Sequence, residues 1–84
     1  MTPAAARIGR FLRVRECPDA REVIGRPEWK VIANEDTPLA TVDWYPKWRC
    51  YVLRAERGTI WSDDCLADLS RWMLTQTTAQ RKTP

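Results

Sequence analysis

Two aromatic-rich runs separated by a Pro-Lys dipeptide constrain the fold of this chain more than any other feature. Residues 42–45 read Val-Asp-Trp-Tyr, and residues 48–53 read Trp-Arg-Cys-Tyr-Val-Leu. Both runs are rich in the aromatic and β-branched residues that favour strands. Proline presets the backbone of a turn, so Pro46 and Lys47 favour a reversal between the two runs. The sequence therefore predicts a β-hairpin at the centre of a small sheet.

The sequence leaves the register of this hairpin open by one residue. Proline in the turn favours type I geometry, with or without a bulge, over a tight primed turn. The preferred register directs to the core Trp44, Trp48, Cys50 and Val52. It leaves on the opposite face Tyr45, Arg49, Tyr51 and Leu53. A slip of one residue in the second strand would exchange its two faces.

Residues 11–16 alternate in the manner of a first strand. Leu12 and Val14 point to one side in this interpretation, and Arg13 and Arg15 point to the other. A helix is the alternative, because apolar residues of this stretch also recur at helical spacing. The glycine just before it and its β-branched content favour the strand.

Further elements surround the hairpin. Pro18 and Gly25 bracket one or two helical turns, because proline suits the first turn of a helix and glycine suits its end. Residues 28–34 and 39–45 predict two more strands joined by a polar turn. Residues 59–61 predict a short final strand.

The stretch after Ser62 predicts the longest helix. Ser62 is a suitable N-cap, and Asp63 and Asp64 place negative charge in the first turn, where the helix dipole favours it. Apolar residues then recur at three- and four-residue spacing, namely Cys65, Leu66, Leu69, Trp72 and Met73. The helix is expected to end near Gln76, because no apolar stripe continues beyond it.

Together these elements predict one α+β domain. It is a meander of three to four antiparallel strands with a short extra N-terminal strand or helix, and the C-terminal amphipathic helix packs across one face. A chain of 84 residues makes a single domain. We expect the domain to span residues 9–76, with a disordered lead-in over residues 1–8 and a disordered tail over residues 77–84.

The composition argues against catalysis and metal binding. The chain contains no histidine, which is the usual general base. Its three cysteines, Cys17, Cys50 and Cys65, are widely separated and form no C-x-x-C pair, so a structural zinc is not expected. We expect a non-enzymatic protein with no catalytic residues, metal ligands or cofactors.

No stretch of the sequence indicates export or membrane insertion. The N-terminus lacks the apolar run of a signal peptide, and no segment approaches the roughly 20 apolar residues of a membrane span. We therefore expect a cytoplasmic protein with reduced thiols and no membrane partner.

One face of the predicted sheet lacks a cover, because a single long helix covers only one side. This helix-free face supplies the candidate interaction surface: Tyr45, Arg49, Tyr51, Leu53, Lys30 and Ile32. Such a mixture is too apolar for plain solvent exposure. The short helix or the N-terminal segment is one possible cover. A protein partner or a second copy of the chain is another, because interface cores are rich in tyrosine and arginine.

Single-stranded nucleic acid is the alternative partner for the same face. Bases could stack on Tyr45 and Tyr51. The formal net charge is +3, with the excess near the N-terminus. The candidate nucleic-acid contacts are Arg7, Arg10, Arg13 and Arg15. We favour protein association, because this basic excess lies outside the aromatic surface and Asp43 lies on it.

Part of the chain resembles a family of small proteins encoded in bacteriophages and bacterial prophages. The residues that carry the resemblance are Trp29-x-Val31-x-x-Asn34, then Trp44-Tyr45, Trp48-Arg49 and Tyr51, then Cys65-Leu66-x-Asp68-Leu69. The resemblance runs from Trp29 to Leu69. It implies a common fold and an accessory protein that binds a host or phage component in the host cytoplasm. It implies no activity and no site.

Overall fold

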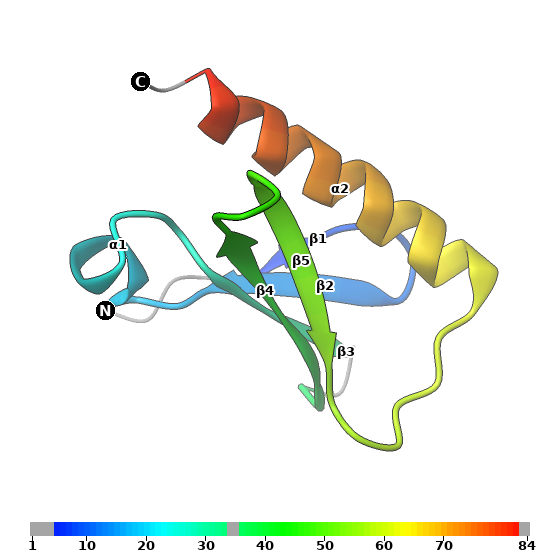
Figure 1. Cartoon of the computed structure of the whole chain (residues 1–84). Coiled ribbons are helices and arrows are strands. Elements are labelled where there is room, and N and C mark those ends of the chain that lie inside the picture. Colours follow the sequence, from blue (N-terminus) through cyan, green and yellow to red (C-terminus); the bar gives the residue numbers. More distant parts are fainter. Residues whose placement is uncertain (1–4, 34–35, 83–84) are drawn as a thin grey trace.

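Among the residues that the structure describes, five antiparallel strands and one long helix build the fold (Figure 1). The structure, a computed structural model, describes residues 5–33 and 36–82. The strands are β1 (Ala6–Arg7), β2 (Leu12–Glu16), β3 (Trp29–Ala33), β4 (Pro38–Tyr45) and β5 (Cys50–Ala55). The helices are α1 (Ala20–Val23) and α2 (Asp63–Arg81). Each strand pairs with the next along the chain, which confirms the α+β meander with more strands than the three to four predicted.

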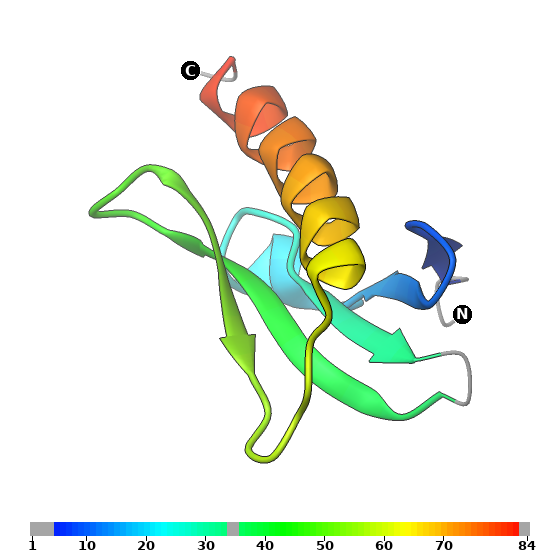
Figure 2. The same ribbon diagram turned by 90° about the vertical axis from the view of Figure 1, so that its right-hand side faces the viewer.

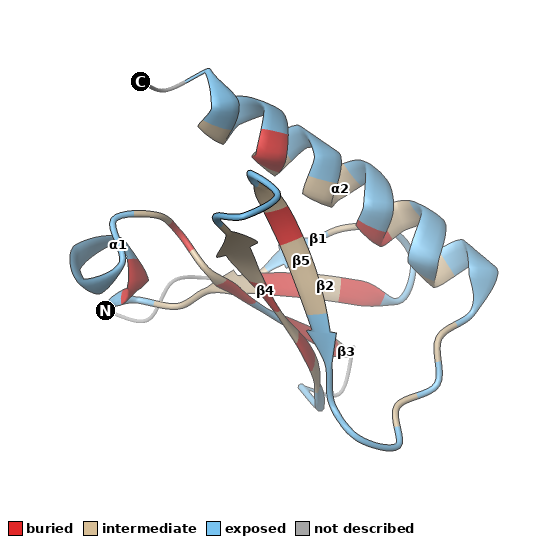
Figure 3. Cartoon of the chain, viewed as in Figure 1, coloured by how far each residue is buried: buried red, intermediate tan, exposed pale blue. Residues whose placement is uncertain are grey.

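Helix α2 forms a second layer over one face of the sheet, and the core lies between the two (Figures 1 and 2). Val31 and Val42 are completely buried, and Leu69 of α2 is 2% exposed. The remaining buried members of this core are Leu12, Val14, Trp29, Ala40 and Tyr51. In Figure 3 the buried positions follow the central strands and the underside of α2. The alternation of apolar residues along the strands thus becomes one buried face.

The beginning of α2 agrees with its sequence signals. The Ser62 Oγ accepts a hydrogen bond from the Cys65 backbone N–H at 3.1 Å, which is the expected N-cap. Asp63 and Asp64 occupy the first turn.

The end of α2 differs from the prediction, because the helix continues past Gln76 to Arg81. Polar contacts hold these last turns without an apolar stripe. The Thr77 Oγ1 accepts from the backbone N–H of Tyr51 at 3.0 Å. Gln80 accepts from Arg26 at 3.0 Å, and Arg81 Nε donates to a carbonyl of the β4–β5 turn at 2.7 Å. The expected disordered tail is therefore wrong for residues 77–81, and residues 83–84 lie outside the described range.

The N-terminal elements settle the choice between strand and helix in favour of strand. Residues 12–16 form β2, and Ala6 and Arg7 pair with Val14 and Arg13 as β1. The expected lead-in is thus structured at residues 6–7, while residues 1–4 lie outside the described range. The stretch at 59–61 is not a strand; the Trp61 side chain instead packs partly buried against the core.

The register of the β4–β5 hairpin is opposite to the preferred one. Tyr45 pairs with Cys50, and Trp44 pairs with Tyr51. The turn takes four residues, 46–49, because the backbone N–H groups of residues 48 and 49 both bond to the Tyr45 carbonyl, and Arg49 adopts a φ of 52°. The second strand consequently starts at Cys50, and Trp48 remains in the turn with 67% of its surface exposed.

Candidate interaction surfaces

The six residues of the predicted interaction surface do not share one face. Tyr51 and Leu53 lie on the same face as Trp44, under α2, and Tyr51 is only 4% exposed. Arg49 lies in the turn before β5. The other three, Tyr45, Lys30 and Ile32, are on the helix-free face, but Ile32 is buried there with 4% of its surface exposed. The aromatic surface expected there therefore lacks Tyr51, because the longer turn shifted the register by one residue.

The N-terminal arginines also divide. Arg13 and Arg15 alternate with the buried residues of β2, and Arg7 pairs with Arg13, so these three lie on the helix-free side. Arg10 lies elsewhere, over the ring of Phe11 at 5.8 Å and beside the first turns of α2. The structure brings together three of the four predicted nucleic-acid contacts.

Tyr51 links three parts of the fold. Its ring meets the rings of Trp29 and Trp44 edge to face, with centroids 5.2 and 5.3 Å apart. Its hydroxyl donates to the Pro27 carbonyl at 2.9 Å, and its backbone N–H donates to Thr77. Burial raises the pKa of Tyr51 to about 12, with nearby arginines opposing the shift. The role of this tyrosine is therefore structural.

The raised pKa of Tyr51 predicts a loss of stability at high pH. An unfolded tyrosine has a pKa of about 10, so both states carry the neutral phenol below that pH. Above it the unfolded state ionises first, and stability falls until the pH passes the folded pKa of about 12. The free energy of unfolding should fall by at most about 3 kcal/mol over this range. Urea unfolding of the wild type and Tyr51→Phe at a series of pH values measures it; parallel curves for the two proteins would contradict the assignment.

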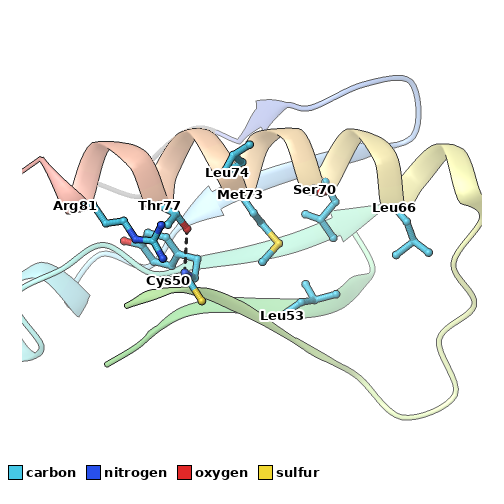
Figure 4. Close-up of a pocket in the computed structure, with 10 residues that line it drawn as sticks. Cys50, Leu53, Leu66, Ser70, Met73, Leu74, Thr77 and Arg81 are labelled. Atoms are coloured by element: carbon cyan, nitrogen blue, oxygen red, sulfur yellow. Dashed lines mark hydrogen bonds between the residues drawn. The ribbon is translucent and has the colours of Figure 1, made fainter. Parts of the chain in front are cut away.

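An apolar groove between α2 and β5 is a feature that sequence reasoning missed (Figure 4). It has a volume of about 370 Å³. Its lining residues are Cys50, Tyr51, Leu53, Leu66, Leu69, Ser70, Met73, Leu74, Thr77 and Arg81. Leu66 and Met73 extend from α2 toward Leu53 of β5 in the close-up. We call this the α2–β5 groove.

The rim of the groove carries exposed leucines. Leu66 is 47% exposed, and Leu74 is 65% exposed. With Ser70 between them they follow a four-residue spacing, which places all three along one flank of the helix. That spacing was the available sequence signal. The core stripe predicted for α2 included Leu66 and did not include Leu74.

The charges of α2 are segregated along its length. The three acids lie in the first third of the helix, at Asp63, Asp64 and Asp68, and the cations follow at Arg71, Arg81 and Lys82. Asp68 and Arg71 form an ion pair with each other. The groove thus runs beside a helix that is acidic at one end and basic at the other.

The described residues contain neither a metal-binding cluster nor a disulfide. Within residues 5–33 and 36–82, no group of three or more Cys, Asp and Glu side chains is placed to hold a metal ion. The three cysteines are free, and burial together with Glu28 raises the pKa of Cys17, which favours its thiol form. No helix in this part of the chain is long and apolar enough to cross a membrane.

The fold and the groove define a small α+β protein with one helix over a five-stranded meander. Comparisons with models of protein families, with curated proteins and with solved structures found no match to this chain. The resemblance to bacteriophage and prophage proteins accordingly stays a prediction.

Proposed function

We propose that the protein is a non-catalytic self-association module, in which the α2–β5 groove binds the same region of a second copy. The observation that supports this most is an apolar groove with Leu66 and Leu74 exposed at its rim. Exposed leucines beside a hollow lose water contact when a matching surface closes over them. This proposal moves the interaction surface from the helix-free face to the flank of α2.

The flank suits the packing of two antiparallel helices. Leu66, Ser70 and Leu74 form one ridge of the four-residue kind that packs into the groove of a facing helix. The small side chain of Ser70 at the middle of this ridge permits close approach of two backbones. A two-fold axis near Ser70 would seat each Leu74 beside the partner's Leu66, as an isologous interface requires.

Charge favours the same antiparallel arrangement. With the axis near Ser70, the acidic start of one α2 comes within about one helical turn of Arg81 of the other. The opposed helix dipoles also attract, because each N-terminus lies beside a C-terminus. A second copy is therefore a better complement to this surface than a uniformly charged partner would be.

The proposal keeps the expectation of an accessory protein of phage or prophage type that works in the cytoplasm without cofactor or metal. The sequence resemblance supports the phage context, and the lack of histidine supports the absence of catalysis. A monomeric wild type in the test below would exclude self-association and leave the groove to a different protein.

Leu74→Glu should separate the two copies. A carboxylate at the rim opposes burial of the groove, so the dissociation constant of the dimer should rise by at least about tenfold. Sedimentation equilibrium over a range of protein concentrations measures it. Val23→Glu is the matched control, because Val23 is 80% exposed on α1, away from the groove.

Two results would contradict self-association. One is a wild-type chain that stays monomeric up to about 1 mM, because the free energy of association would then be less than about 4 kcal/mol. The other is an equal effect of Leu74→Glu and Val23→Glu. Circular dichroism of each variant establishes that the fold is intact.

A further inference from the structure

Four cations form two like-charged pairs on the helix-free face. The sheet register places Arg7 directly opposite Arg13, and Arg15 directly opposite Lys30. Directly opposed like charges destabilise a pair of strands. We call these four residues the basic stripe. Two such pairs on one face are a cost to folding that an anion on this face would offset.

The acids of the described residues neutralise only part of the stripe. Asp36 lies 2.5 Å from Arg13 and 4.0 Å from Arg15, so its carboxylate contacts two guanidinium groups. Within residues 5–33 and 36–82, no carboxylate lies at ion-pair distance from Arg7 or Lys30. The Lys30 Nζ donates instead to the Thr41 hydroxyl at 3.1 Å. Among the described residues, the basic stripe therefore has more cations than carboxylates.

The stripe continues across the sheet. Arg15 pairs with Lys30, Lys30 with Thr41, and Thr41 with Arg54, so one transverse row crosses β2, β3, β4 and β5. Neighbouring strands lie about 4.8 Å apart, which gives this row a length of about 14 Å. Arg54 is held by both carboxylate oxygens of Asp43 at 3.1 Å, so the positive excess is greatest over β1–β3.

An aromatic pair lies at the far end of the same face. Tyr45 is on the helix-free side of β4, and the exposed Trp48 packs edge to face against it with centroids 4.8 Å apart. Unstacked bases stack on such rings, while the bases of a duplex are already stacked inside it. Arginine, in turn, binds phosphate through paired N–H groups.

From these features we infer that the helix-free face binds single-stranded nucleic acid, with the phosphate backbone on the basic stripe and a base on Trp48. The predicted nucleic-acid contacts change accordingly: Arg10 is excluded and Lys30 is added. The face is opposite to α2, so this inference does not depend on the proposed self-association.

Lys30→Glu tests the inference, with Arg57→Glu as the control. Both variants change the charge equally, but Arg57 lies in the exposed turn after β5. Fluorescence anisotropy with a labelled single-stranded oligonucleotide of mixed sequence should show about tenfold weaker binding for Lys30→Glu and less than about twofold for Arg57→Glu. The slope of log affinity against log salt should flatten by about 0.7 or more for Lys30→Glu alone.

A stability measurement excludes misfolding as the cause. Lys30→Glu places a carboxylate opposite Arg15, so its melting temperature should rise by a few degrees while binding falls. Lys30→Gln removes the charge without reversing it and should weaken binding by an intermediate factor. The inference is overturned if the wild type does not bind the single strand at low salt, if both glutamate variants weaken binding equally, or if a duplex binds as tightly as the single strand.

Discussion

Trp29→Ala is expected to lower the free energy of unfolding by about 3–5 kcal/mol. Trp29 is 8% exposed and meets the rings of both Tyr51 and Trp72 edge to face, with centroids 5.2 and 4.7 Å apart. It thereby joins β3 to β5 and to α2. Truncation leaves a cavity in the middle of the core, and a domain of this size has only about 5–10 kcal/mol to lose. Guanidinium chloride unfolding measures the change.

Trp48→Ala is the matched control for this loss. The same side chain is removed, but Trp48 is 67% exposed in the β4–β5 turn. Its substitution should cost about 0.5 kcal/mol or less. Equal costs for the two variants would mean that the core does not lie between β3 and α2.

Gly9→Ala is expected to cost about 3 kcal/mol, because two penalties coincide. Gly9 has a φ of +113°, which side chains rarely adopt. A Cβ built there would also lie 2.1 Å from Asp68 Oδ2 and 3.1 Å from Asp68 Cβ, so the Asp68 carboxylate would have to rotate away and the backbone would have to shift by a few tenths of an ångström. Thermal and denaturant unfolding measure the loss.

Gly25→Ala measures the penalty for backbone strain without the steric clash. Gly25 has a φ of +87°, but nothing lies within 4 Å of its Cβ position. Its substitution should cost about 1–2 kcal/mol from backbone strain alone. Asp68→Ala in the Gly9→Ala background should recover part of the difference. If Gly9→Ala and Gly25→Ala cost the same, the close approach of Gly9 to α2 is disproved.

Local patterns in the sequence predicted most of the fold. The alternation in β2 and β3, the N-cap at Ser62 and the apolar spacing in α2 each depend on neighbouring residues. Each is confirmed, except that Leu66 of the predicted α2 stripe is exposed. The errors arose where contacts between residues far apart in the sequence determine the structure. The last turns of α2 are held by partners in other elements, such as Arg26, and no pattern within the helix reveals them.

The candidate site was predictable only in part, and a single turn explains most of the difference. Proline and lysine marked the reversal correctly, but the left-handed conformation of Arg49 lengthened the turn and set the register. Side chains alternate between the two faces of a strand, so a register shifted by one residue changes which of them face the core. Tyr51 and Leu53 therefore lie on the core face, where Cys50 and Val52 were predicted. The groove beside α2 required the spatial relation of helix to edge strand, which the sequence does not contain.

The hydrogen bond from the Tyr51 N–H to Thr77 also bears on solubility. β5 is an edge strand, and the free N–H groups of such strands recruit strands of other molecules into aggregates. The Thr77 hydroxyl blocks one of these groups, and α2 lies along the same strand. Fraying of the last helical turns would free that group while the rest of the sheet remained folded. The integrity of the C-terminal end of α2, rather than global unfolding, would then govern how long the protein stays in solution at high concentration.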